Sequence, residues 1–160
     1  MYRLAEVLGR ALSARGYKLV TAESCTGGWL AQAITAVPGS SEWFERGFVV
    51  YSNASKCELL GVRTDTLARF GAVSVETALE MAQGALQASH AQVSVAITGI
   101  AGPAGGTTEK PVGTLCLGWQ GGPLPPQTRA FRIEGTREGV RRQAVVAALE
   151  GLIERLGTGA

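Results

Sequence analysis

Ser24 is the first residue whose type and place in the sequence suggest catalysis. It lies in the segment Thr21-Ala22-Glu23-Ser24-Cys25-Thr26-Gly27-Gly28, between a β-branched run at 18–22 and a helical pattern at 27–36. We expect its hydroxyl to lie beside the amino terminus of that helix, where free N–H groups could stabilise an oxyanion in acyl transfer. The competing interpretation is that the hydroxyl residues here only cap the helix.

A serine nucleophile needs a neighbouring base, and the usual choice is histidine. The single histidine, His90, precedes the strand pattern at 92–98 and is therefore expected at the opposite edge of a sheet. Because arginine stays protonated, a cationic base must be a lysine. The candidates are Lys18, Lys56 and Lys110. Lys56 is the best placed, since it follows the strand pattern at 47–51, but it could equally be a solvated lysine in the first turn of a helix.

Two further segments could bind anionic groups of a ligand. The glycine-dense stretch 98–108 follows a strand pattern, so its backbone N–H groups could approach a phosphate; a flexible loop is the alternative. It lacks the lysine of a P-loop, and no GxGxxG motif follows the first strand, which disfavours the dinucleotide and NTP folds. Arg137 and Arg141 share one face of the last helical pattern and could pair with an anion, although solvated arginines are commoner. Cys25 has no visible partner to lower its pKa, and we interpret it as packing.

The elements that must position these residues alternate between strands and helices. Strands are predicted at 18–22, 47–51, 92–98, 113–119 and 128–133. Helices are predicted at 2–14, 27–36, 55–60, 64–70, 75–89 and 137–156. The near-continuous apolar runs at 48–51 and 93–97 are typical of central strands with helices on both faces. The short connection 120–127 predicts an antiparallel last pair, and hence a mixed sheet in an α/β fold.

Composition limits the class of protein. At 160 residues, with 46% hydrophobic and 18% charged residues, the chain is expected to fold as one domain, 1–160. A formal charge of +2 without a basic stripe argues against a nucleic-acid partner. The charges within the first helical pattern argue against a signal peptide or membrane span, which predicts a cytoplasmic protein without a membrane partner. Three unpaired cysteines and one histidine predict reduced thiols and no metal or other cofactor.

Several motifs in order resemble one known family, the CinA carboxy-terminal family of stand-alone nicotinamide mononucleotide deamidases. The resemblance covers nearly the whole chain, through TAESCTGG, WFERGFVVYSNASK, GAVS, TGIAGPAGG, EKPVGT and TREGVRRQA. It implies a three-layer α/β/α fold with a mixed five-stranded sheet. It also implies that the small-molecule partner is nicotinamide mononucleotide, which is converted to nicotinate mononucleotide and ammonia in the pyridine nucleotide cycle.

The resemblance also implies roles for single residues. Ser24 would attack the carboxamide carbon, Lys56 would take and return the proton, and Tyr51 and Thr98 would line and orient the site. Substrate binding is expected at Thr26, Gly27, Gly28, Asn53, Gly99, Ala101, Gly102, Arg137 and Arg141. Either arginine could match the family's arginine at this segment. The chain reads Gly135-Thr136-Arg137 where the family commonly has GDR, so no ion pair from that aspartate is carried over.

Two other functional hypotheses remain beside the amidohydrolase. A non-catalytic nucleotide-binding module of the competence-damage type would keep the pocket without turnover. A DNA-processing factor has only the family name in its favour. A homodimer or higher homo-oligomer is expected from the family, with Trp43 and Phe44 as candidate contact residues.

Overall fold

The computed structural model describes residues 1–123 and 125–157 and shows a five-stranded mixed sheet. The strands are β1 (Leu19–Glu23), β2 (Phe44–Val49), β3 (Val93–Gly99), β4 (Thr114–Gly121) and β5 (Gln127–Arg132). Their order is β2-β1-β3-β4-β5. The pairs β1–β2 and β1–β3 are parallel, while β3–β4 and β4–β5 are antiparallel. The predicted antiparallel last pair and the mixed sheet are confirmed.

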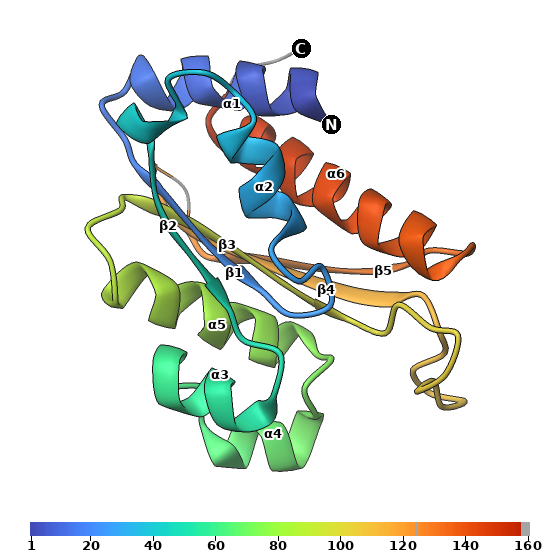
Figure 1. Cartoon of the computed structure of the whole chain (residues 1–160). Helices are drawn as coiled ribbons and strands as arrows, with labels where there is room; N and C mark the ends of the chain where they lie inside the picture. Colours follow the sequence, from blue (N-terminus) through green and yellow to red (C-terminus); the bar gives the residue numbers. More distant parts are fainter. Residues whose placement is uncertain (124, 158–160) are drawn as a thin grey trace.

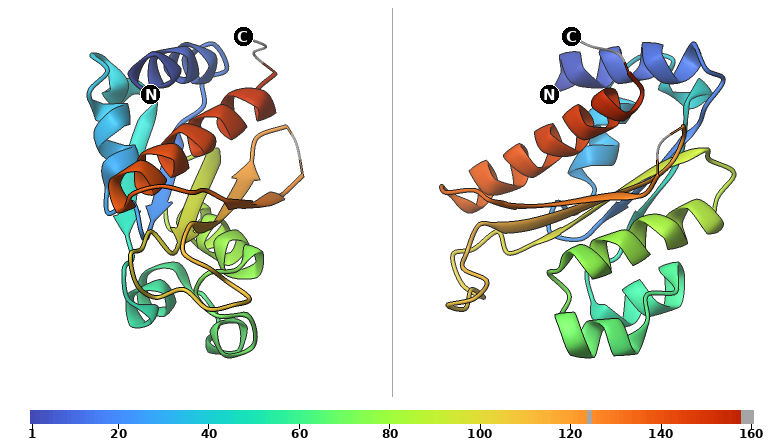
Figure 2. Two further views of the ribbon diagram at one scale, coloured as in Figure 1. Left: turned by 90° about the vertical axis from the view of Figure 1, so that its right-hand side faces the viewer. Right: turned by 180° about the vertical axis from the view of Figure 1, so that it is seen from behind.

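Helices cover both faces of the sheet and give three layers (Figures 1 and 2). They are α1 (Tyr2–Ser13), α2 (Trp29–Thr35), α3 (Asn53–Leu60), α4 (Thr64–Phe70), α5 (Val75–Gln87) and α6 (Arg137–Arg155), with a short 3₁₀ turn at Ser40–Glu42. Helices α1, α2 and α6 lie on one face, and α3, α4 and α5 lie on the other. The α/β class predicted from the alternating pattern is confirmed.

Strands β1 and β3 are buried on both faces because each face of the sheet packs into a separate apolar core. From β3, Val93, Val95 and Ile97 pack into the larger core with α1, α2 and α6, whereas Ala96 points into the smaller core against α5. All residues of β1 are buried as well. This double burial explains the near-continuous apolar run of β3, whereas the equally buried β1 also carries Thr21 and Glu23.

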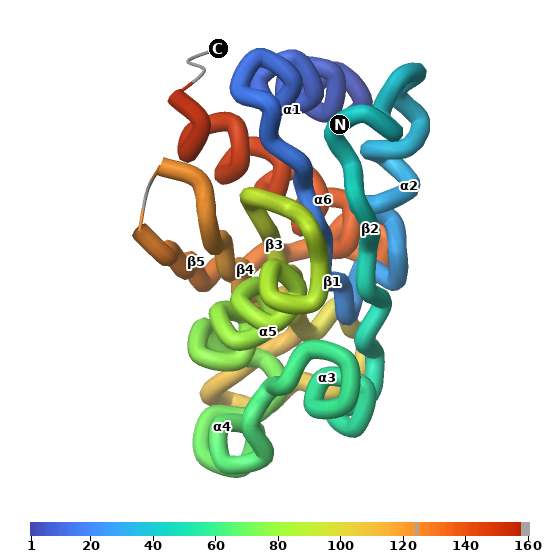
Figure 3. The backbone as a smooth tube through the Cα atoms, turned by 90° about the vertical axis from the view of Figure 1, so that its left-hand side faces the viewer, coloured from blue at the N-terminus to red at the C-terminus, as the bar shows by residue number. Residues whose placement is uncertain are grey.

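The expectation that the run 48–51 forms a central strand was wrong. The strand β2 ends at Val49 and lies at the edge of the sheet beside β1, as Figure 3 shows. Val49 is 51% exposed and Tyr51, beyond the strand, is 64% exposed. An apolar run alone does not distinguish a central strand from an edge strand.

Helices α3, α5 and α6 each begin at a hydroxyl side chain that accepts a backbone N–H. Ser52 accepts the N–H of Ser55 at the start of α3, and Ser74 accepts the N–H of Thr77 at the start of α5. Thr136, where the family pattern has aspartate, accepts the N–H of Gly139 at the start of α6. Since threonine also caps helices well, α6 keeps its boundary without a carboxylate.

Trp43 is not available as an interface residue, contrary to the expectation from sequence. It is 4% exposed and belongs to the larger core with α1, and Phe44 is half-buried against the same core. Among helices in the described part of the chain, none is both long and apolar enough to span a membrane.

Candidate active site

A cavity opens beyond the carboxyl ends of the parallel strands, where ligands bind in sheets of this kind. Its volume is about 270 Å³. Predicted site residues that line it are Ser24, Tyr51, Asn53, Lys56, Thr98, Gly99, Ala101, Gly102 and Arg137. The first turns after β1, β2 and β3 and the start of α6 all contribute, although they are far apart in the sequence. In Figure 2 the loop between β3 and β4 lies beside the start of α6.

Ser24 and Lys56 meet inside this cavity. The Nζ of Lys56 lies 3.2 Å from the Oγ of Ser24, within hydrogen-bond distance. Two backbone carbonyls also accept from Nζ, that of Val50 at 3.0 Å and that of Tyr51 at 3.2 Å. Both side chains are almost completely buried, with 7% of Ser24 and 1% of Lys56 exposed. Lys56 is therefore not the solvated lysine that its sequence also allowed.

Burial lowers the pKa of Lys56 from its ordinary value of 10.5, because the charged ammonium loses its hydration. The nearby thiols of Cys25 and Cys57 act weakly in the opposite direction. A larger fraction of the amine is thus neutral near pH 7 than for a solvated lysine. A neutral amine next to a hydroxyl can act as a general base.

The helix after Ser24 begins later than expected, and its first N–H groups are not free. Helix α2 starts at Trp29, so a five-residue turn, 24–28, separates it from β1. The buried carboxylate of Glu23 accepts the N–H of Leu30 at 2.8 Å and that of Ala31 at 3.0 Å. The expectation that this helix terminus offers free donors to an oxyanion was therefore wrong.

The turn 24–28 depends on two consecutive glycines with left-handed backbones. Gly27 has φ of 59° and Gly28 has φ of 94°. Residues with a Cβ adopt such angles at a cost of about 1 kcal/mol or more each. The Ser24 backbone is fixed at both groups, since its N–H donates to Ile97 on β3 and its carbonyl accepts from Gly27.

The glycine-dense loop brings other backbone N–H groups to the cavity. Ala101 and Gly102 line the cavity, and within the described residues their N–H groups have no acceptor. The sequence pointed to this loop as an anion-binding segment. Because the loop follows a strand pattern, the sequence also placed it at the same end of the sheet as Ser24 and Lys56, and in the structure all three line one cavity.

Three other predicted residues surround the pair. Thr98 is buried and donates its hydroxyl to the carbonyl of Ala72 at 2.8 Å, which joins the loop before α5 to β3. Arg137 donates to the carbonyl of Gly102 at 2.7 Å and to the hydroxyl of Tyr51 at 3.3 Å. Tyr51 and Arg137 thus form one wall of the cavity.

Four predicted residues lie elsewhere, in a second hollow of about 390 Å³ on the other side of the nucleophile turn. This second hollow is lined by Thr26, Gly27, Gly28, Trp29, Gln32 and Arg141. The structure therefore separates the two arginines, with Arg137 in the cavity beside Ser24 and Arg141 outside it.

The remaining candidates for nucleophile or base do not fit the chemistry. Burial raises the pKa of Cys25 to about 11, so its thiolate is scarce near neutral pH.

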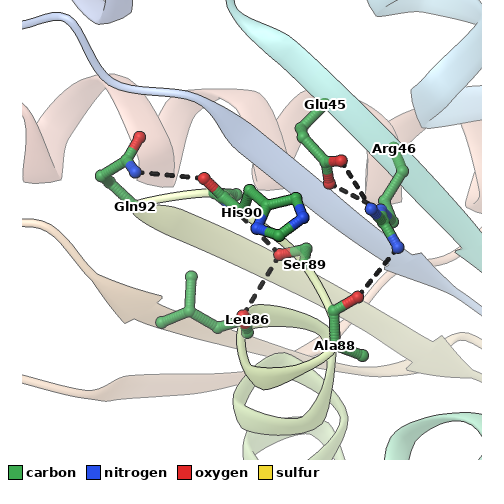
Figure 4. A network of polar contacts seen from close by, with 8 residues as sticks. Glu45, Arg46, Leu86, Ala88, Ser89, His90 and Gln92 are labelled. Carbon is green, nitrogen blue, oxygen red and sulfur yellow. Dashed lines mark hydrogen bonds and ion pairs between the residues drawn. The ribbon is translucent and has the colours of Figure 1, made fainter.

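The other possible bases lie away from Ser24. Lys110 donates to the carbonyl of Phe70 on the surface, and Lys18 precedes β1 at the amino ends of the parallel strands. Figure 4 shows His90 near Glu45 and Arg46. His90 precedes β3, whose first residue pairs with the first residue of β1, whereas Ser24 follows the last residue of β1. In the part of the chain that the structure describes, no three His, Cys, Asp or Glu side chains gather as a metal site.

Comparison with known proteins gives one consistent family. The family model described as the CinA C-terminal domain matches residues 1–156. The chain is 52% identical to the nicotinamide-nucleotide amidohydrolase PncC of Escherichia coli (strain K12), covering 95% of this chain and 92% of that protein. It is 51% identical to the protein of the same name from Pseudomonas putida, covering 97% and 96%. Among solved structures, the competence/damage inducible protein CihA from Agrobacterium tumefaciens superposes with a TM-score of 0.94 at 45% identity, covering 98% of this chain and 95% of that one.

Proposed function

The chain belongs to the CinA C-terminal domain family, and on that premise we propose that it hydrolyses the carboxamide of nicotinamide mononucleotide to give nicotinate mononucleotide and ammonia. The observation that carries the proposal is the buried contact of 3.2 Å between Lys56 Nζ and Ser24 Oγ. It supplies a nucleophile and a base, the two groups that amide hydrolysis through an acyl-enzyme requires. The substrate is inferred from the names of the relatives that this chain matches over nearly their whole length.

In the first half of the reaction, neutral Lys56 takes the hydroxyl proton as Ser24 Oγ bonds to the carboxamide carbon. The carbonyl oxygen then carries the negative charge of the tetrahedral intermediate, and the free N–H groups of Ala101 and Gly102 are the donors suited to stabilise it. Lys56 next gives its proton to the amide nitrogen. The C–N bond breaks, ammonia leaves, and a nicotinoyl ester remains on Ser24.

The second half repeats the proton transfers with water. Lys56 takes a proton from a water molecule whose oxygen attacks the ester carbon. The C–O bond to Ser24 breaks and Lys56 returns the proton to the Ser24 oxygen. The acid formed gives its remaining proton to solvent, so nicotinate mononucleotide is released as the carboxylate and the enzyme regains its starting state. No metal or organic cofactor takes part in these steps.

The residues suited to recognise the nucleotide lie on the wall of the cavity that Tyr51 and Arg137 form. Arg137 is exposed and lines the cavity, and its planar guanidinium is suited to the substrate phosphate. Tyr51 accepts from the same guanidinium and is 64% exposed, which leaves its ring free to contact the ribose or the pyridinium. Asn53 lies beside it at the start of α3.

The test is ammonia release from nicotinamide mononucleotide by the wild type and by Ser24→Ala and Lys56→Ala variants. Loss of either member of the pair is expected to lower kcat by about 10³-fold or more, because the two groups act as a unit. Lys18→Ala is the matched control, since that lysine lies at the amino edge, and it should keep full activity.

Two outcomes would count against this function. Turnover that persists in Ser24→Ala would exclude the acyl-enzyme. Binding of the nucleotide without any product from the wild type would favour the non-catalytic module instead. The cytoplasmic location, the homo-oligomer and the single-domain boundary remain predictions from the sequence.

A further inference from the structure

We infer that Arg141 is a positioning residue for the proposed reaction, holding the nucleophile turn 24–28 in place, and that it is not a ligand of the substrate. The inference rests on the proposed function only for the reaction that Ser24 performs. Its basis is the pair of bonds from one guanidinium to two consecutive carbonyls. Arg141 Nε donates to Cys25 O and Arg141 Nη2 donates to Thr26 O, each at 3.0 Å.

These two bonds fix the orientation of the peptide planes between residues 25 and 26 and between residues 26 and 27, which begin one residue after the nucleophile. A trans peptide is planar, and its C=O and N–H point in opposite directions. The peptide that contains the Thr26 carbonyl also contains the N–H of Gly27, and this N–H donates to the carbonyl of Ser24 at 3.0 Å. Arg141 is therefore connected to the Ser24 backbone through a single peptide unit.

The guanidinium is itself held in place. Its central carbon lies 5.3 Å from the ring centroid of Trp29, a cation–π distance, so the arginine is packed between the turn and α2. On the other side of the turn, Glu23 binds the first N–H groups of the same helix. The turn thus lies between an anion that holds α2 and a cation that holds the carbonyls.

Arg137 differs from Arg141 in ways that separate positioning from binding. Arg137 lines the cavity that contains Ser24, whereas Arg141 lines only the second hollow behind the turn. With Nε and Nη2 on the turn and the guanidinium packed against Trp29, Arg141 has little left to offer a substrate in the cavity. One turn of α6 thus carries two arginines facing opposite sides of the nucleophile.

The experiment compares Arg141→Ala, Arg141→Lys and Arg137→Ala with the wild type in steady-state ammonia release. For Arg141→Ala we expect kcat to fall about 10- to 100-fold with KM within about threefold, because a small displacement of reacting groups lowers the rate without weakening binding. Arg141→Lys should also be impaired, since an ammonium lacks the planar fork that spans two carbonyls. Arg137→Ala should mainly raise KM. Arg142→Ala, an exposed neighbour on the same helix, is the control and should match the wild type.

Two further measurements distinguish positioning from loss of fold. Millimolar guanidinium chloride should restore part of the kcat of Arg141→Ala, which an unfolded protein would not show. Labelling of Ser24 by a fluorophosphonate, in which the serine oxygen displaces fluoride from phosphorus, should be slower in Arg141→Ala and faster again with guanidinium. If Arg141→Ala does not fold, the labelling rate and kcat of Arg141→Lys give the answer.

The results that test the role of Arg141 can be distinguished from those that test the proposed function. A raised KM with unchanged kcat in Arg141→Ala would make Arg141 a substrate ligand and overturn the inference, as would kinetics and labelling identical to the wild type. A wild type that labels on Ser24 but releases no ammonia would overturn the proposed function, while the labelling comparison would still decide the part played by Arg141.

Discussion

Lys56 differs from a surface lysine in two measurable respects. It is 1% exposed, and each of its three nearest polar neighbours, Ser24 Oγ and the carbonyls of Val50 and Tyr51, lies within 3.2 Å of Nζ. Burial lowers its pKa, while the carbonyl contacts hold the amine toward the hydroxyl. Lys56 can act as a base only when it is uncharged, and its buried position disfavours the charged form.

The pH dependence of kcat/KM follows from this environment. The base must be neutral, so the rate should rise with pH along a limb set by Lys56, and the midpoint of that limb should fall below 10.5 because its pKa is lowered. Lys56→Arg, which stays protonated, should be inactive at every pH. A limb with its midpoint at or above 10.5, or a rate that falls as the pH rises toward 10.5, would contradict the assignment.

Cys25 lines the cavity beside Ser24 yet is expected to be dispensable for chemistry. With its pKa raised to about 11 by burial, it should react slowly with iodoacetamide at neutral pH, and Cys25→Ala should keep kcat within a few-fold. The half-buried Cys57 provides a comparison, since it should be modified first. Modification of Cys25 in step with loss of activity, absent from Cys25→Ala, would reopen it as the nucleophile.

The sequence was informative about which residue types could react and which strand ends carry them. Ser24 and Lys56 were identified because both follow strand patterns and no histidine shares that edge. The contacts of Glu23 and Arg141 were missed because they depend on where a helix begins and on how α6 crosses the turn. One signal was present for Glu23, a lone carboxylate in a run of otherwise uncharged strand residues.

At the scale of elements, the alternating pattern predicted each of the five strands and six α-helices found in the described residues, with shifts at their ends. Helix α4 was predicted with its observed bounds, whereas β2 begins three residues earlier and ends two residues earlier than expected. The position of β2 at the edge could not be read from its apolar run. The order of the strands depends on how the helical connections pack across the sheet, and that packing involves residues that are distant in the sequence.

Helix α5 packs closely against the end of α3 at Gly84. A Cβ built on Gly84 would lie 1.8 Å from the carbonyl oxygen of Leu60. The obstacle is backbone, so a change of rotamer cannot relieve it.

Gly84→Ala should therefore lower the free energy of unfolding by about 1–3 kcal/mol or more from overpacking, which exceeds the gain of about 1 kcal/mol in helix propensity. Thermal unfolding would measure this, with a decrease of about 2–4 °C per kcal/mol. Gln87→Ala, exposed on the same helix, should leave Tm nearly unchanged. An equal or higher Tm for Gly84→Ala would mean that the two helices separate more easily than their packing indicates.

At the scale of the whole molecule, the carboxyl and amino ends of the parallel strands carry different features. The carboxyl edge carries the cavity and its reactive pair. The amino edge carries exposed polar contacts such as the ion pair of Arg46 with Glu45. Since surface pairs of this kind contribute little to stability, the two cores on either face of the sheet provide most of it.

Burial of Lys56 also makes the stability of the whole chain depend on pH. Where both states are protonated, below the folded pKa, the cost of burying the charge is fully present. Between the folded pKa and 10.5 only the unfolded state holds the proton, so the free energy of unfolding rises with pH.

The difference in unfolding free energy between the wild type and Lys56→Met should therefore shift in favour of the wild type across that window. The slope should not exceed about 1.4 kcal/mol per pH unit, the value for one proton. Urea denaturation at several pH values measures it. A difference that stays constant up to 10.5 would show that folding does not perturb the lysine.

The trio of acceptors around Nζ also determines which way the hydrogen bond to Ser24 runs. An ammonium has three hydrogens, one for each of Ser24 Oγ, Val50 O and Tyr51 O. A free amine has two hydrogens and one lone pair, and carbonyl oxygens have nothing to give it. When the proton departs, only the serine can turn its O–H toward the lone pair, so the same event that creates the base reverses this bond and leaves the oxygen ready to attack.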